Sequence, residues 1–228
     1  MKLSISMTRR EFLLGWAYLL IDLFALPLLL NAGNQQLLRP LSETELNLVY
    51  FFVNFLMILI IFRKFLSNSL RQAIRAPWQC LRFAVLGFIL YYLAMIAVSH
   101  GITYLKPDFV NVNDAAVMDM TQEQFTLMSI ATVFLVPITE EVLFRGLLFQ
   151  GLHKRSRFLA YAASTLVFSL IHVTGYVGRQ DGFTLLLCFV QYVPASVALA
   201  WAYEKSDTIL SPMLIHMTVN QISISAMR

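Results

Sequence analysis

Long apolar segments alternate with short polar segments along almost the whole chain. A helix needs about 20 residues to cross the ~30 Å hydrocarbon core of a bilayer. Seven segments approach or exceed that length, and they are 11–31, 46–66, 81–100, 124–152, 158–176, 183–203 and 207–225. The fourth is overlong and contains Pro137, which predicts a kink or two joined segments. The pattern predicts an all-α protein, a polytopic transmembrane helical bundle of about seven to eight spans with an intramembrane polar cavity.

Composition agrees with this pattern. Of the 228 residues, 58% are hydrophobic and 13% are charged, whereas a soluble domain carries about 25% charged residues. The formal net charge of +4 is small, and basic loops explain it better than a nucleic-acid surface does. We therefore expect an integral membrane protein whose partner is the lipid bilayer, with no nucleic acid bound.

Basic residues are concentrated in alternate loops. They lie before the first span, after the second and after the fourth, at Lys2, Arg9, Arg10, Arg63, Lys64, Arg71, Arg75, Arg82, Lys154, Arg155 and Arg157. By the positive-inside rule these loops face the cytosol. We expect a multi-pass protein of the bacterial cytoplasmic membrane with a cytosolic N-terminus, and seven crossings would leave the C-terminus outside.

One polar stretch interrupts the fourth apolar segment. Glu140, Glu141 and Arg145 lie within six positions of one another, between two apolar runs. A charged residue at the centre of a membrane helix costs at least about 2.5–3.5 kcal/mol on insertion scales. Three such residues need partners or water, and intramembrane ionisable residues usually mark a functional site.

Two later spans carry polar residues at a similar depth. His172 lies in the fifth span, and His216 and Asn220 lie in the seventh. Counting about 1.5 Å per residue from the cytosolic ends, these residues and Glu140 fall within one layer about 7 Å thick. This coincidence predicts one shared buried site. Asp22 of the first span stands alone, and we interpret it as a structural or cavity-facing polar residue.

Helical spacing predicts which of these side chains share a helix face and can contact one another. Glu141 and Arg145 are four residues apart and share a helix face, so they can form a buried ion pair. Glu140 points about 100° away and is expected to be the free carboxylate, with Arg145 as a second possible partner. His172 lies four residues after Phe168, whose ring can shield the imidazole. His216 and Asn220 have the same spacing and can project into one cavity.

Two chemistries fit this set of groups. In the first, Glu140 and His172 activate a water molecule, while His216 and Asn220 donate hydrogen bonds to the oxyanion of an attacked amide. In the second, Glu140, His172 and His216 bind a divalent metal such as zinc. No His-Glu-x-x-His signature of the zincin proteases is present.

Three motifs together resemble those of a known family. Glu140-Glu141-x-x-x-Arg145, Phe168-x-x-x-His172 and His216-x-x-x-Asn220 occur in this order on late spans, and Gly146 also fits. The set is similar to that of the CPBP family, the CAAX proteases and bacteriocin-processing enzymes, also called the Abi family. These are intramembrane endopeptidases related to the type II CAAX prenyl proteases. The resemblance covers about 122–225, the expected catalytic core, whereas 1–121 match only as N-terminal spans and loops of the same integrated membrane domain.

The resemblance implies a hydrolase that cleaves a peptide or membrane-protein substrate. It implies Glu140 and His172 as water activators, His216 and Asn220 as oxyanion donors, and Glu141 and Arg145 in support. Both metalloprotease and glutamate-type mechanisms are compatible with it, so a metal remains an open alternative.

Other interpretations remain. Glu141 and Arg145 can serve only as a structural ion pair. The whole chain can be a non-enzymatic bacteriocin-immunity or partner-scaffold protein that keeps the family's fold. A proton-coupled carrier that uses Glu and His as a relay is a third alternative, which the small size and the absence of visible inverted repeats disfavour.

Overall fold

Helices make up most of the structure. It is a computed structural model that describes residues 3–226, and no β-strand occurs among them. The α-helices and π-helical turns (η) are, in chain order, α1 (Arg9–Leu20), η1 (Ile21–Ala25), α2 (Leu26–Asn34), α3 (Glu43–Ile61), α4 (Arg63–Arg75), α5 (Pro77–Leu105), α6 (Val112–Glu123), α7 (Phe125–Ile130), η2 (Ala131–Leu135), α8 (Val136–Glu141), η3 (Val142–Phe149), α9 (Gln150–His153), α10 (Arg157–Thr174), α11 (Gly182–Ser206) and α12 (Leu210–Ala226).

The predicted all-α, polytopic helical bundle is confirmed, with six rather than seven to eight helices of spanning length among the described residues. Within residues 3–226, six helical segments are long and apolar enough to cross a membrane: Arg9–Asn34, Glu43–Ile61, Pro77–Leu105, Phe125–His153, Arg157–Thr174 and Gly182–Ser206. They correspond to the first six predicted segments. The seventh forms α12, which has only 17 residues. At 1.5 Å per residue α12 is roughly 26 Å long, slightly less than the ~30 Å hydrocarbon core. The chain is thus an integral, multi-pass membrane protein.

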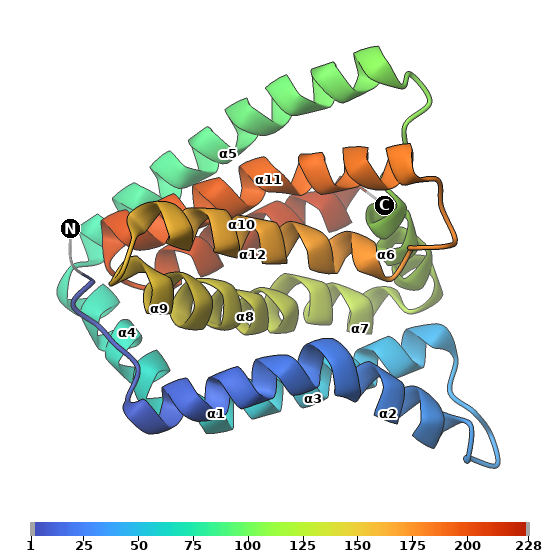
Figure 1. Cartoon of the computed structure of the whole chain (residues 1–228), viewed down its shortest axis with the longest axis horizontal. Coiled ribbons are helices and arrows are strands. Elements are labelled where there is room, and N and C mark those ends of the chain that lie inside the picture. The colour runs from blue at the N-terminus through green and yellow to red at the C-terminus, as the bar shows by residue number, and fades with distance from the viewer. Residues whose placement is uncertain (1–2, 227–228) are drawn as a thin grey trace.

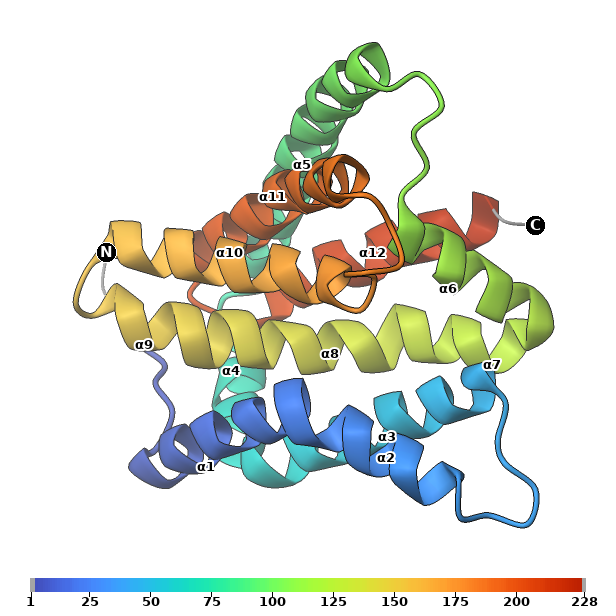
Figure 2. The same cartoon turned by 45° about the vertical axis from the view of Figure 1, so that its right-hand side comes forward.

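The fourth span lies at the centre of the bundle. In both views α1, α2 and α3 lie on one side of the α7–α9 segment, and α10, α11 and α12 lie on the other (Figures 1 and 2). Half of the residues in its most apolar stretch are buried, as in α11, against 28% or fewer in the other four spans. The ionisable residues of this span are therefore surrounded by protein rather than by lipid.

Two prolines inside spans are accommodated by π-helical turns. η1 ends two residues before Pro27 and η2 ends two residues before Pro137. In each turn the N–H of the residue before the proline bonds to the carbonyl five residues back. The expected kink or junction at Pro137 is therefore a π-helical turn within one continuous segment, Phe125–His153. π-helical turns are common at functional sites.

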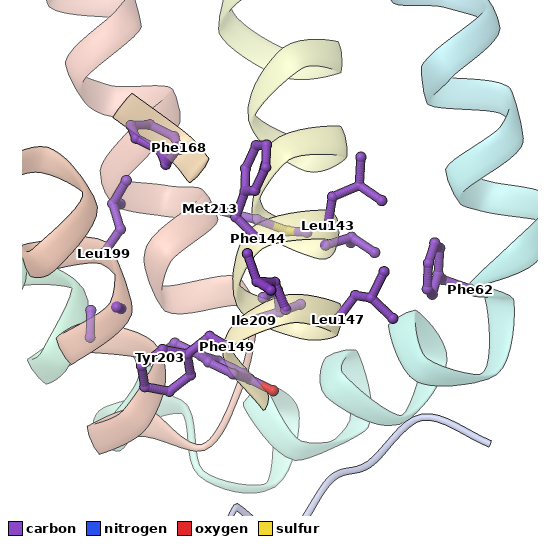
Figure 3. Packing of buried hydrophobic residues seen from close by; sticks show 14 of the residues in the cluster. Phe62, Leu143, Phe144, Leu147, Phe149, Phe168, Leu199, Tyr203, Ile209 and Met213 are labelled. Carbon is purple, nitrogen blue, oxygen red and sulfur yellow. The ribbon is translucent and has the colours of Figure 1, made fainter. Parts of the chain in front are cut away.

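The hydrophobic core is built around η3, all eight residues of which are buried. Figure 3 shows its side chains against those of neighbouring helices, and the labelled set is Phe62, Leu143, Phe144, Leu147, Phe149, Phe168, Leu199, Tyr203, Ile209 and Met213. Lipid tails are as apolar as these side chains, so close packing rather than exclusion of water favours this arrangement. The packing holds the segment that follows Glu141 rigidly in place.

Basic segments far apart in the sequence lie at the same end of the bundle (Figure 1). Glu11 of α1 accepts the backbone N–H groups of Lys64 and Phe65 in α4, at 3.0 and 2.8 Å. Thr208 in the turn after α11 donates to the carbonyl of Ser69 at 3.0 Å, and Gln150 of α9 donates to the carbonyl of Ile5. These contacts join the N-terminal segment, α4 and the end of the fourth span.

Candidate active site

A buried ion pair lies at the centre of the site. Arg145 Nη1 donates to Glu141 Oε1 at 3.1 Å, and neither side chain is exposed. Arg145 Nη2 lies 3.2 Å from Ser196 Oγ and 3.4 Å from the Ser196 carbonyl oxygen. The guanidinium also lies over the ring of Phe168, 4.4 Å from its centroid. Salt bridge, hydrogen bonds and cation–π contact together compensate the arginine for its lost hydration.

His216 is held between two carboxylates. Its Nδ1 lies 2.9 Å from Glu141 Oε1, the same oxygen that Arg145 contacts. Its Nε2 lies 4.0 Å from Glu140 Oε2. A buried carboxylate paired with arginine is an acceptor only, so Nδ1 carries the proton and Nε2 faces Glu140. Glu141 thus sets the orientation of the imidazole, as outer carboxylates commonly do for functional histidines.

Glu140 is the free carboxylate of the group. Its Oε2 atom is buried and makes no hydrogen bond to another described residue, although its side chain as a whole is 16% exposed. The predicted pairing of Arg145 is with Glu141, and among the described contacts no hydrogen bond joins Arg145 to Glu140. The carboxylate of Glu140 is therefore available to a molecule that enters the site.

The π-helical turn before Pro137 supplies the partner of Asn220. In a regular α-helix the carbonyl of Thr132 would accept a hydrogen bond from the N–H of Val136. Here that N–H bonds to the carbonyl of Ala131 instead. The next residue, Pro137, has no N–H. The Thr132 carbonyl is therefore free to accept a hydrogen bond from Asn220 Nδ2, at 2.8 Å. This bond also fixes the orientation of the amide group, because a carbonyl oxygen accepts only from the NH₂ side.

His172 and His216 both lie close to the ring of Phe168. The Nδ1 of His172 donates to the Phe168 carbonyl at 2.7 Å, which leaves Nε2 as an acceptor. The Phe168 ring centroid is 4.7 Å from that of His172 and 6.2 Å from that of His216. The predicted shielding of His172 by Phe168 is present. Among the described contacts, none joins His172 directly to Glu140 or His216.

The candidate metal ligands do not converge. Within residues 3–226, no three His, Cys, Asp or Glu side chains lie close enough together to hold a metal ion. The Nδ1 atoms of His172 and His216 are engaged, so only their Nε2 atoms could bind a metal. The proposed set of Glu140, His172 and His216 therefore does not fit a zinc site in this arrangement, since zinc needs at least three protein ligands at about 2 Å.

Three neutral partners of the site gave no signal in the sequence. Ser196, Tyr192 and Thr132 contact the polar residues of the site, yet none of them is costly in an apolar span.

Asp22 was interpreted from the sequence as a structural or cavity-facing polar residue. It is buried, accepts a hydrogen bond from Tyr50 at 2.8 Å, and lies within electrostatic range of Glu140. It is thus a buried polar residue with a hydrogen-bond partner of its own.

Comparison with known proteins finds a family that the second half of the chain resembles. Residues 122–222 match the model of the Rce1-like type II CAAX prenyl endopeptidases. This segment is therefore similar to the Rce1-like family. The match confirms the resemblance drawn from the three motifs, and the Rce1-like segment contains every residue that carries them.

One relative extends the comparison. The UPF0177 protein YxdF of Lactococcus lactis subsp. lactis is 28% identical to this chain over 94 residues, which are 41% of this chain and 46% of that protein. The match thus spans less than half of the relative's length. No solved structure matches the chain.

Proposed function

We propose that this protein is an intramembrane endopeptidase that hydrolyses a peptide bond with water activated by Glu140. The observation that carries the proposal is the arrangement of Glu140 and His216. A carboxylate oxygen without a hydrogen-bond partner faces an imidazole nitrogen 4.0 Å away. The Rce1-like family match of residues 122–222 supports the same reaction class.

Glu140 is the general base in this mechanism. It takes a proton from water, and the oxygen of that water forms a bond to the carbonyl carbon of the substrate. The resulting tetrahedral oxyanion collapses, the carbon–nitrogen bond breaks, and the proton held by Glu140 passes to the leaving amine. A free acid and a free amine result, and Glu140 returns to its carboxylate form.

His216 and Asn220 stabilise the oxyanion. His216 Nδ1–H is used by Glu141, so donation from Nε2 requires a doubly protonated ring. In that form the formal charges of His216, Arg145, Glu140 and Glu141 sum to zero. Asn220 has two N–H bonds, of which Thr132 occupies one. The second remains for the substrate, and each donor of this kind contributes about 10²–10³ to kcat.

His172 completes the water site. Because its Nδ1–H donates to the Phe168 carbonyl, its Nε2 lone pair can accept a hydrogen bond from water. The mechanism derives no step through a metal, because the donors do not converge on one point.

The orientation in the membrane follows from charge. The basic N-terminal segment, α4 and the loop after α9 lie at one end of the bundle, and we place that end in the cytosol. In this orientation the substrate is a membrane-bound peptide or protein that reaches the site from the cytosolic side. The description of the matching family suggests a peptide with a prenylated C-terminal Cys-aliphatic-aliphatic-X segment as the first probe.

The test uses the full-length protein in lipid vesicles and a quenched fluorescent peptide with this prenylated C-terminus. In parallel, peptide termini are compared by proteomics in membranes of cells that express wild type or Glu140→Gln. Glu140→Gln, which keeps the shape and removes the base, is expected to lower kcat by about 10²–10⁴. The matched control is Glu43→Gln on the exposed start of α3, which should retain activity. Cleavage by Glu140→Gln at the wild-type rate rejects the mechanism. No cleavage by either protein in both assays favours the scaffold or immunity alternative.

A further inference from the structure

The aromatic ring of Tyr192 covers one face of the His172 ring. The two rings are stacked, with centroids 4.1 Å apart and an interplanar angle of 27°. Phe168 packs on His172 at a centroid distance of 4.7 Å, and the Phe168 carbonyl holds Nδ1. The hydrogen bond limits movement of one ring atom only, so the two aromatic contacts determine how the plane of the imidazole lies.

Tyr192 is itself held by a helix outside the spans. Its hydroxyl donates to Asp114 Oδ1 at 2.8 Å and accepts from Asn113 Nδ2 at 3.1 Å. Both partners lie in the first turn of α6, which Asn111 caps by accepting the N–H groups of these same two residues. The hydroxyl is thus fixed by a rigid, capped helix terminus.

Further contacts make this connection a latch, which we define as the polar bonds from residues 106–114 to α11. Lys106 Nζ donates to Thr184 Oγ1 at 2.6 Å, and Asn111 Nδ2 donates to Gln191 Oε1 at 2.9 Å. Together with the two bonds to Tyr192, these hydrogen bonds are spread along α11 from Thr184 to Tyr192, over more than two helical turns. Figure 1 shows α6 at the end of the bundle opposite to α4 and α9.

We propose that Tyr192 is a positioning residue for His172, and that the latch from α6 keeps the Tyr192 ring stacked on the imidazole. The proposal rests on the proposed function, in which Nε2 of His172 holds the attacking water. In that mechanism Nε2 must point to the water activated by Glu140, and a turn of the ring would move Nε2 away from it. Misplacing a reacting group by about 1 Å can cost 10²-fold in rate, so a contact that touches no substrate still controls the reaction.

This arrangement also connects one end of the bundle to the catalytic layer. Residues 106–123 lie outside the spans at the end away from the basic loops, whereas His172 lies within α10. Although α6 also packs against α10, the bonds to Tyr192 connect α6 to the side chain that is stacked on the His172 ring.

The test compares three substitutions in the full-length protein. Tyr192→Leu removes both the stack and the hydroxyl, Tyr192→Phe removes only the hydroxyl, and Asp114→Asn weakens the bond from α6. Matched controls are Tyr104→Leu, at an 88% exposed tyrosine, and Asp108→Asn, at an exposed aspartate. Two quantities are measured: kcat and KM for the prenylated peptide, and the ¹⁵N NMR shifts of histidine-labelled protein, with the His172 signal assigned by its loss in His172→Gln.

We expect wild type to show His172 with the proton on Nδ1. Tyr192→Leu is expected to show averaged tautomers and a kcat lower by about tenfold, with KM changed less than twofold. Tyr192→Phe and Asp114→Asn are expected to lower kcat by roughly two- to fivefold, and both controls should match wild type.

An unchanged His172 spectrum in Tyr192→Leu, or in Tyr192→Phe and Asp114→Asn if the leucine variant does not fold, overturns the proposal. The NMR result does not depend on turnover, so it is separate from the proposed function, which fails if Glu140→Gln or His172→Gln cleaves normally.

Discussion

Asn220 Nδ2 donates to the backbone carbonyl of Thr132 at 2.8 Å, across the contact between α12 and η2. The Thr132 carbonyl is free to accept this bond because the Val136 N–H bonds to the Ala131 carbonyl in η2 and Pro137 has no N–H. A proline in the fourth span thus determines how an amide on the last helix is oriented.

Pro137→Ala is therefore expected to reduce activity without unfolding the protein. Alanine restores an N–H and allows a regular α-helix, which would give Thr132 back its intrahelical donor and release Asn220. We expect kcat to fall by about tenfold or more, since an oxyanion donor contributes 10²–10³. Helicity by circular dichroism and kcat for the peptide are the measurements.

Pro27→Ala is the control for this prediction. Pro27 follows η1 with the same hydrogen-bond pattern as Pro137 follows η2, but its turn faces no catalytic residue of α12. It should keep wild-type kcat. Equal losses of activity in both variants would contradict the role assigned to Pro137.

The ion pair of Glu141 and Arg145 is expected to contribute strongly to stability. Glu141→Gln or Arg145→Gln alone leaves a buried charge without its partner, which typically costs about 3–5 kcal/mol. The double substitution should cost less than the sum of the two. Free energies of unfolding in mixed micelles, compared as a double-mutant cycle, measure this coupling.

Lys106 and Asp181 provide the contrast. Their charged atoms are 3.8 Å apart, and their side chains are 27% and 59% exposed. Pairs with this access to solvent contribute about 0–1 kcal/mol. Lys106→Met should therefore change stability by no more than this. Additive losses in the Glu141 and Arg145 cycle would show that the buried pair is not coupled.

Activity is expected to be insensitive to metal removal. The His and Glu donors of the site do not converge on one point, so a chelator has no metal to withdraw from the mechanism proposed here. After dialysis against EDTA, kcat should stay within about twofold of its starting value. Loss of a catalytic ion would instead lower kcat far more, since such an ion supplies several kcal/mol of transition-state stabilisation. Activity lost in EDTA and restored by zinc would require a different arrangement of Glu140, His172 and His216.

Gly146, directly after Arg145, is expected to tolerate no side chain. A Cβ atom there would lie 2.8 Å from Cε1 of the buried Phe65 ring and 3.0 Å from Cε of Met7. Overpacking of this kind costs about 1–3 kcal/mol, so Gly146→Ala should lower the unfolding free energy by that amount. Gly101→Ala is the matched control, because no atom lies within 4 Å of its Cβ position.

The spacing of residues along the sequence was sufficient to predict the side-chain contacts within one helix. Glu141 with Arg145 and Phe168 with His172 are four residues apart, and a helix brings such pairs together whatever packs around it. The first six spans could also be located from the sequence, because insertion into a bilayer depends on runs of apolar residues.

Contacts between helices could not be predicted in this way. The sequence predicted a common depth for Glu140, His172 and His216. It did not predict that both histidines approach the Phe168 ring, or that Arg145 and His216 share one oxygen of Glu141. Ser196, Thr132 and Tyr192 are small or neutral, so no energetic cost marks them in an apolar segment.

The sequence by itself determined a multi-pass helical membrane protein with a costly cluster of charges in its fourth span, since hydropathy and helical periodicity are properties of consecutive residues. Only the tertiary structure decided that Glu140 stays free while Glu141 takes both Arg145 and His216, and that α6 reaches His172 through Tyr192. Those outcomes depend on which helices are neighbours and on how a π-helical turn rotates one face toward the next, and neither is encoded at a fixed spacing along the chain.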